Sequence, residues 1–199
     1  MSVFKGKTIV VAGADCELGG TIVRALVDLE AVVIVIGRDE VTLNKLAHYR
    51  PDRIEPLALN LSRPHSSALL GATWGREPLD LLLMLDVAKQ DARPKMATLD
   101  MQVALIKALI PGLRAAKGAL ILTSGRQTGL YGAVTESALA RLNAGIAKGM
   151  RRHGVRSNLI GFENETFDAT DFVQVLAFTL AMPTMNGSTL YLSPHSPQT

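Results

Sequence analysis

The residues best suited to ligand chemistry lie in a glycine turn near the start of the chain. The turn follows an apolar run and reads AGADCELGG over residues 12–20. Gly13 permits a tight turn, and Gly19 lets a following helix pack closely on the strand. Amides at the start of such a helix can meet a pyrophosphate group. The turn therefore predicts a phosphate site made by Gly13, Asp15, Cys16, Glu17, Leu18 and Gly19.

The middle glycine of the usual phosphate-binding turn is absent here. Depending on the spacing expected, Cys16 or Glu17 takes its place. A side chain there crowds the approach of a ligand, and Glu17 with Asp15 would place carboxylates near an anion. Two interpretations stay open, a dinucleotide site and a plain strand-to-helix turn.

A second turn follows the next apolar run and reads Gly37, Arg38, Asp39. It lies close to the distance at which a dinucleotide fold meets the adenosine ribose. A carboxylate at the Gly37 position would favour NAD, whereas glycine followed by Arg38 suits a 2′-phosphate. If a cofactor binds, the sequence predicts NADP. The alternative is that Arg38 and Asp39 form a solvated turn and helix cap.

The elements that position these turns alternate between strand and helix. Most of the apolar runs are continuous, as in strands covered on both faces of a parallel sheet. Residues 134–150 carry a helical apolar face, and a second helix covers about residues 96–116 and ends near Pro111 and Gly112 or slightly beyond. We therefore expect one doubly wound, Rossmann-type α/β domain over residues 1–193, with about seven parallel strands, helices on both faces and a flexible tail at 194–199. The expected strands are residues 8–12, 32–36, 54–59, 81–85, 119–122, 155–160 and 188–192.

Composition excludes several other classes of protein. With 199 residues and 48% hydrophobic content, the chain suits one buried domain and not a disordered tail protein. A net charge of +3 gives nucleic-acid binding no support. The single cysteine, Cys16, excludes an internal disulfide, and no Cys/His cluster has metal-ligand spacing. No signal core or membrane span is evident, so we expect a cytoplasmic protein without membrane partners.

Five segments in the right order resemble the short-chain dehydrogenase/reductase family over the full chain. They are residues 4–13, 37–39, 118–125, 152–158 and 186–192. The resemblance implies a Rossmann fold, an NAD(P) cofactor, a small carbonyl or alcohol as substrate, and assembly into a homodimer or homotetramer.

The resemblance also assigns roles to individual residues. Ser124 stands where the family has its substrate-orienting serine, and Tyr131 where it has its proton-transferring tyrosine. Asn60 and Leu61 follow the third strand, where the family contacts adenine. Ala88 is the surviving residue of the family's loop after the fourth strand.

The family's Tyr-x-x-x-Lys pair is incomplete in this chain. Alignment on Tyr131 puts Thr135 at the lysine position, and counting back from Asn158 puts Gly132 and Glu136 at the two positions. Neither register supplies a lysine, and a phenol titrating near ~10 needs a nearby cation to act as a base at neutral pH. The sequence therefore leaves two hypotheses. One is an NADP(H)-dependent oxidoreductase with a degenerate site, and the other is an inactive pseudoenzyme serving as a dimerising or regulatory module.

Overall fold

The computed structural model describes residues 2–63, 65–85, 96–125, 130–162 and 168–192. Within these ranges, the backbone alone is described for Glu17, for residues 96–98 and for residues 130–132. Ala88 and the tail at 194–199 lie outside the described residues.

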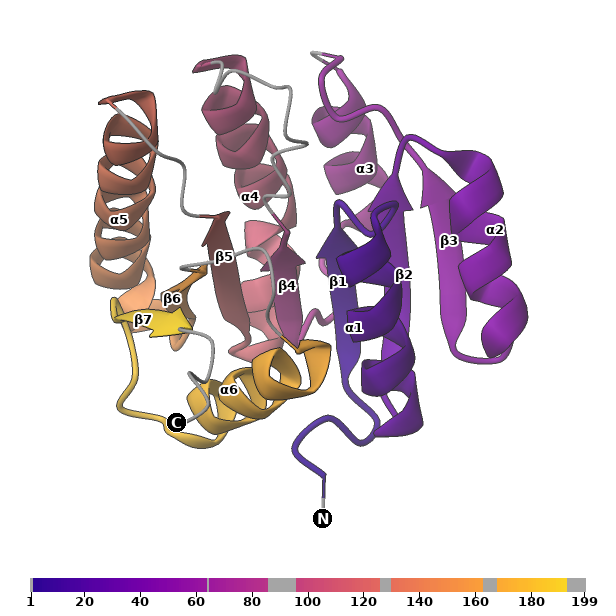
Figure 1. Ribbon diagram of the computed structural model, residues 1–199. Helices are drawn as coiled ribbons and strands as arrows, with labels where there is room; N and C mark the ends of the chain where they lie inside the picture. The colour runs from indigo at the N-terminus through magenta and orange to yellow at the C-terminus, as the bar shows by residue number, and fades with distance from the viewer. Residues whose placement is uncertain (1, 64, 86–95, 126–129, 163–167, 193–199) are drawn as a thin grey trace, which may run out of the picture.

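A single sheet of parallel strands forms the centre of the molecule (Figure 1). Its seven strands lie in the order β3-β2-β1-β4-β5-β6-β7, which confirms the predicted doubly wound fold. The central strands are largely continuous apolar runs because helices cover both faces of the sheet. Their bounds are β1 Thr8–Ala12, β2 Val32–Gly37, β3 Ile54–Ala58, β4 Leu81–Met84, β5 Ala119–Gly125, β6 Arg156–Phe162 and β7 Thr189–Leu192.

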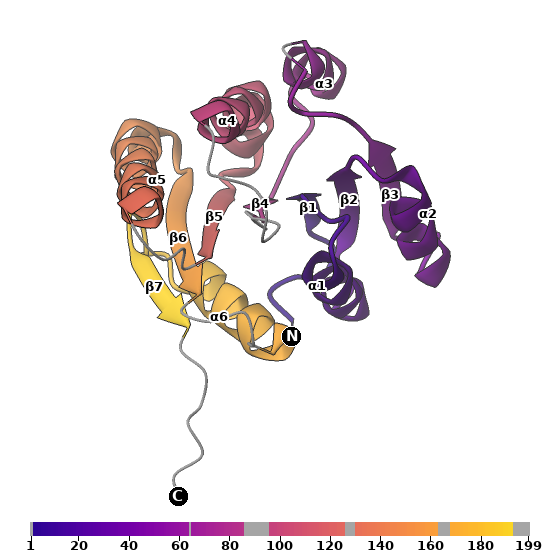
Figure 2. The same ribbon diagram turned by 45° about the horizontal axis from the view of Figure 1, so that its top comes forward.

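The helices form a layer on each side of the sheet (Figures 1 and 2). One core contains Ile22, Leu43 and Phe172 and lies under α1, α2 and α6. The other contains Leu109 and Leu139 and lies under α3, α4 and α5. The helices are α1 Glu17–Asp28, α2 Glu40–Tyr49, α3 Ser66–Trp74, α4 Met96–Ala116, α5 Leu130–Met150 and α6 Ala169–Ala181, with a 3₁₀ turn at Arg151–His153.

Four elements extend beyond their predicted bounds. Strand β2 continues one residue further, to Gly37, and β6 continues two residues further, to Phe162. Strand β5 continues to Gly125 instead of ending at residue 122, because Ser124 pairs with Gly161 and Gly125 pairs with Phe162 of β6. Helix α5 begins at Leu130, four residues before the predicted start. The predicted helix at 96–116 is confirmed and passes through Pro111.

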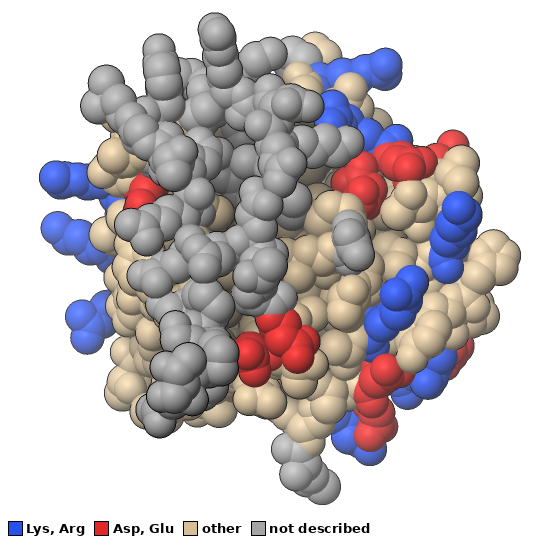
Figure 3. Space-filling view, viewed as in Figure 1, with Lys and Arg blue, Asp and Glu red and all other residues tan. Residues whose placement is uncertain are grey.

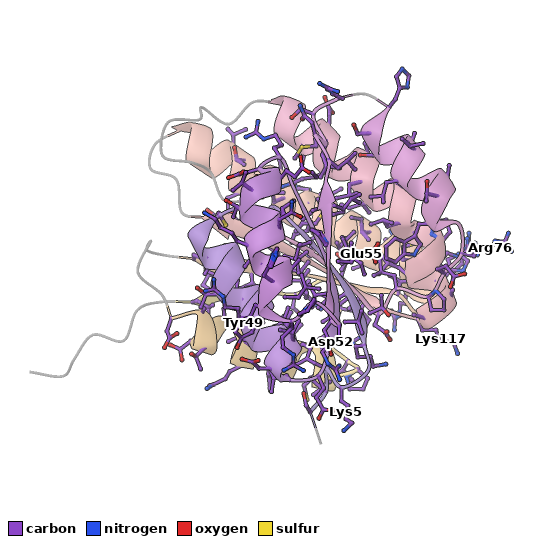
Figure 4. The ribbon with its side chains drawn as sticks, turned by 90° about the vertical axis from the view of Figure 1, so that its right-hand side faces the viewer. Lys5, Tyr49, Asp52, Glu55, Arg76 and Lys117 are labelled. Atoms are coloured by element: carbon purple, nitrogen blue, oxygen red, sulfur yellow. The ribbon has the colours of Figure 1, made fainter. Side chains whose placement is uncertain are left out.

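Charged side chains lie on the edge strand β3 and at the amino ends of the strands. Figure 4 faces this edge, with Glu55 on β3 and with Asp52 and Lys5 toward its lower end. Glu55 is exposed on the edge strand and Pro56 follows it, and both features discourage pairing with another strand. Ion pairs at the amino ends include Lys7 with Asp80 at 2.8 Å. The glycine turn lies at the opposite, carboxyl end.

None of the helices in the described part of the chain combines the length and apolar character that crossing a membrane requires.

Candidate functional site

The candidate site lies where the strand order reverses. Strand β1 is flanked by β2 and β4, so the chain winds outward from it in two directions. In such sheets the ligand crevice lies at the carboxyl ends of the strands beside this switch point. Figure 2 turns that end forward, with α1 on one side of the sheet and α4 on the other.

The first turn requires glycine at position 13. Gly13 has a φ of +82°, and a Cβ there would lie 2.6 Å from the Leu85 carbonyl oxygen at the end of β4. The amides of Gly13 and Ala14 donate to the Ile36 carbonyl at 2.8 and 3.1 Å, which ties the turn to β2. The backbone of the turn is therefore fixed between the ends of two neighbouring strands.

Helix α1 begins immediately after this turn and packs closely on it. A Cβ at Gly19 would lie 2.8 Å from the Ala14 Cα and carbonyl oxygen, so only glycine allows this contact. Cys16 is the N-cap, and its Sγ accepts from the Gly19 amide at 3.2 Å. Leu18 packs partly buried against the core, so its backbone alone is suited to contact a ligand. The side chain of Glu17 lies outside the described residues.

The thiol of Cys16 is expected to react slowly with iodoacetamide. Burial raises the pKa of the Cys16 thiol, and the Asp15 carboxylate adds to the increase, while the Gly19 amide opposes it. The alkylation rate should therefore be lower than that of glutathione and should keep rising with pH beyond the ordinary thiol pKa of about 8.5. Denaturation in guanidinium should restore the ordinary rate. A plateau in the native protein below that pH would contradict the expectation.

The second turn is held by a carboxylate from the first. Asp15 Oδ2 accepts from the Arg38 amide at 2.8 Å and from the Asp39 amide at 3.1 Å. A Cβ at Gly37 would lie 2.5 Å from Asp15 Cγ, so the missing side chain makes room for Asp15. The structure thus brings together Asp15 and Arg38, which the sequence had assigned separately to the cofactor.

The neighbouring Asp39 caps helix α2, as the alternative interpretation of this turn predicted. Its carboxylate accepts from the Val41 and Thr42 amides and from the Thr42 hydroxyl. The hydroxyl and amide of Thr42 hold the pKa of Asp39 below its usual range. Arg38 is exposed, and it contacts Asp15 through its backbone amide.

The residues predicted to contact adenine follow β3. Asn60 Oδ1 accepts from the Ser62 amide at 3.0 Å, and Leu61 packs partly buried against the second core. The Asn60 amide nitrogen therefore remains the polar group suited to a ligand. Ala88 lies in the range 86–95, outside the described residues.

Ser124 lies on the carboxyl end of β5, on the face covered by α4 and α5. It is 6% exposed and lies opposite Gly161 of β6, which in turn lies opposite Tyr191 of β7. Side chains opposite one another in neighbouring strands lie on one face of the sheet. Tyr131 is in the first turn of α5, with its side chain outside the description.

The structure places Tyr191 in the row that Ser124 and Gly161 begin, and sequence reasoning missed this tyrosine. The ring of Tyr191 lies over Gly161, where a Cβ would be 2.7 Å from two ring atoms. The Tyr191 hydroxyl donates to Glu136 Oε1 on α5. Glu136 is the residue that the resemblance puts at the lysine position in one of the two registers, and in that register a carboxylate would stand where the resemblance expects a cation. A glycine within a strand was the available signal that a ring packs there.

Within the described ranges, no three His, Cys, Asp or Glu side chains group closely enough to hold a metal ion.

The chain is similar in structure to known proteins over nearly its whole length. No known family model matches the sequence, and no curated protein matches it. Pseudomonas aeruginosa RhlG, in its active-site complex with NADP, superposes with a TM-score of 0.79 over 97% of this chain and 98% of that one. The two sequences are 16% identical, so this similarity establishes the Rossmann-like fold.

Proposed function

We propose that this chain is an oxidoreductase that binds a nicotinamide dinucleotide at the switch point of its sheet. The observation that carries the proposal is the turn from β1 into α1. There a Cβ at Gly13 or Gly19 would lie within 2.8 Å of backbone atoms, and the turn leads directly into the amino end of a helix. These are the two glycines that a dinucleotide-binding fold uses for the tight turn and for close packing of the helix on the sheet. They place the amides at the start of α1 at the carboxyl end of the strands, where a pyrophosphate could meet them. The predicted preference for NADP(H) depends on Gly37 and Arg38.

A substrate would bind at the carboxyl end of β5, beside Ser124. The bound dinucleotide would supply or accept a hydride at the substrate carbon. The Ser124 hydroxyl would donate a hydrogen bond to the oxygen of a small carbonyl compound. Tyr131 would transfer a proton to that oxygen as the carbonyl is reduced to an alcohol, and would regain it from water. In the reverse direction the same groups would accept the proton.

The missing lysine would limit the rate of this chemistry, because counting from Tyr131 puts Thr135, which carries no charge, at the lysine position. A cation near the tyrosine lowers the pKa of the phenol, whereas a carboxylate near it raises that pKa. Glu136 is held on the β5–β7 side of α5 by Tyr191. We therefore expect slow turnover even with a saturating cofactor.

Replacement of Tyr131 by phenylalanine tests the proposed chemistry. Titration with NADH and NADPH, followed by nicotinamide fluorescence, should show saturable binding. With a panel of small carbonyl compounds, Tyr131→Phe should lower turnover by about 100-fold or more and leave cofactor binding unchanged. The matched control is Tyr49→Phe, because Tyr49 is exposed on α2 and bonds Asp28, away from the carboxyl end. Equal turnover in both variants would contradict the role of Tyr131.

A second candidate function is an inactive relative of such enzymes, serving as a dimerising or regulatory module. The missing lysine favours it. Counting from Tyr131 puts Thr135 at the lysine position, and the other register puts Glu136 there, whose carboxylate accepts from the Tyr191 hydroxyl. Cofactor binding without turnover of any carbonyl compound would support this candidate over the first. Loss of several cooperating groups is expected to reduce catalysis severely.

A further inference from the structure

We propose that Asp15 makes the site prefer a dinucleotide with a free ribose 2′-hydroxyl, NAD(H), over one with a 2′-phosphate. This inference rests on the proposed function, and it reverses the preference that Gly37 and Arg38 predict.

Asp15 already takes the two amides that an anion would use at the end of β2. Its Oδ2 accepts from Arg38 at 2.8 Å and from Asp39 at 3.1 Å. Two consecutive amides directed at one oxygen form a small anion-binding concavity. A 2′-phosphate could use these amides only after the carboxylate had left them.

The carboxylate also occupies the volume next to Gly37. The position of a Gly37 Cβ lies 2.5 Å from Asp15 Cγ and 2.7 Å from Oδ1. In dinucleotide folds an acidic side chain from the end of the second strand accepts from the ribose hydroxyl. Here the same place holds a carboxylate delivered from the first turn. Its Oδ1 has no hydrogen-bond partner in the part of the chain that the structure describes, and so can accept from a ribose.

The charges around this turn also favour NAD(H) over a dinucleotide with a 2′-phosphate. A phosphate monoester carries about two negative charges at neutral pH. Asp15 and Asp39 would face it, and Glu40 begins α2 in the next position. Figure 3 shows acidic side chains over the upper end of β2 and α2, with basic side chains beside them. Arg38 is the cation of this turn, but its exposed side chain is screened by solvent while Asp15 lies in contact with the amides.

The test compares the dissociation constants of NADH and NADPH for the wild-type protein and for Asp15→Ser. Wild type should bind NADH about tenfold or more tighter than NADPH. Serine keeps a short polar side chain without the charge, so Asp15→Ser should bind NADPH about tenfold or more tighter than wild type does, and NADH more weakly. Isothermal titration calorimetry reports both constants without any turnover.

The matched control is Asp28→Ser, which removes an exposed carboxylate at the far end of α1 and should leave both constants unchanged. If Asp15→Ser does not fold by circular dichroism, Asp15→Asn keeps the shape and an acceptor oxygen and should shift the preference in the same direction. Binding of both nucleotides by wild type with equal affinity, or tighter binding of NADPH, would overturn the role of Asp15 and leave the proposed function standing. Binding of neither nucleotide by wild type and both variants would overturn the proposed function, and this inference with it.

Discussion

Gly13→Ala is expected to destabilise the fold by about 3 kcal/mol and to abolish binding of a dinucleotide. Two independent effects add at this position. A φ of +82° is unfavourable for any residue with a Cβ, and that Cβ would lie 2.6 Å from the Leu85 carbonyl oxygen. The carbonyl belongs to the backbone directly after β4, so it cannot move without disturbing the sheet.

The loss of binding has a separate cause from the loss of stability. Relief of the contact with Leu85 moves the turn, and the turn is tied to β2 through the Gly13 and Ala14 amides. Its movement displaces the amino end of α1, where the phosphates would bind. Chemical denaturation gives the free energy of unfolding, and fluorescence titration with NADH gives the binding constant.

Gly6→Ala provides the matched control for this substitution. Gly6 also has a positive φ, +68°, but a Cβ there would meet nothing within 4 Å. Its substitution should cost about 1 kcal/mol from backbone strain alone and leave nucleotide binding intact. Equal destabilisation of both variants would show that the contact with Leu85 has no energetic consequence.

The fold was predictable from the sequence because its central strands are buried on both faces. The predicted strand at 8–12 coincides with β1, Thr8–Ala12. At β5 the prediction stopped at residue 122, since Thr123, Ser124 and Gly125 interrupt the apolar run. The strand nevertheless continues because the ladder with β6 satisfies their backbone groups, and Thr123 Oγ1 donates to the Met84 carbonyl at 3.0 Å. An apolar run in the sequence indicates buried side chains. A strand can continue past the end of that run wherever its backbone is paired with a neighbouring strand.

In the glycine turn, the sequence could predict geometry that depends on the local backbone. Gly13 is of this kind, since its positive φ follows from the tight turn that the motif requires. The role of Asp15 was not predictable, because its partners are amides 23 and 24 positions later in the chain. The contact of Tyr191 with Glu136 spans 55 positions and depends on the register of β7. Contacts of this kind require the three-dimensional arrangement of the sheet.

Asn143→Ala is expected to lower the free energy of unfolding by about 3 kcal/mol. Asn143 is fully buried on α5, and its Oδ1 accepts from the Ser157 hydroxyl at 2.7 Å. Its Nδ2 donates to the Ser188 carbonyl at 3.1 Å. Alanine leaves the buried Ser157 hydroxyl without this acceptor, and an unpaired buried group costs about 1–3 kcal/mol, whereas the Ser188 carbonyl keeps its bond from the Leu159 amide at 2.9 Å.

The loss of Asn143 should also loosen strand β7, because this side chain joins α5 to the residue that precedes the strand. Thermal unfolding and hydrogen exchange of the β7 amides measure the two effects. The exposed Asn44 on α2 supplies the control, since Asn44→Ala removes the same group from a solvated helix face and should leave stability unchanged or slightly raised.

A double-mutant cycle with Ser157→Ala isolates the hydrogen bond from the rest of the site. The two substitutions remove the two ends of one contact, so their combined cost should be less than the sum by about 1 kcal/mol. Additive costs would mean that Asn143 stabilises the protein through packing and the Ser188 carbonyl alone. In that case the connection between α5 and β6 would depend on their apolar contacts, and the hydroxyl of Ser157 would contribute no measurable stability through this side chain.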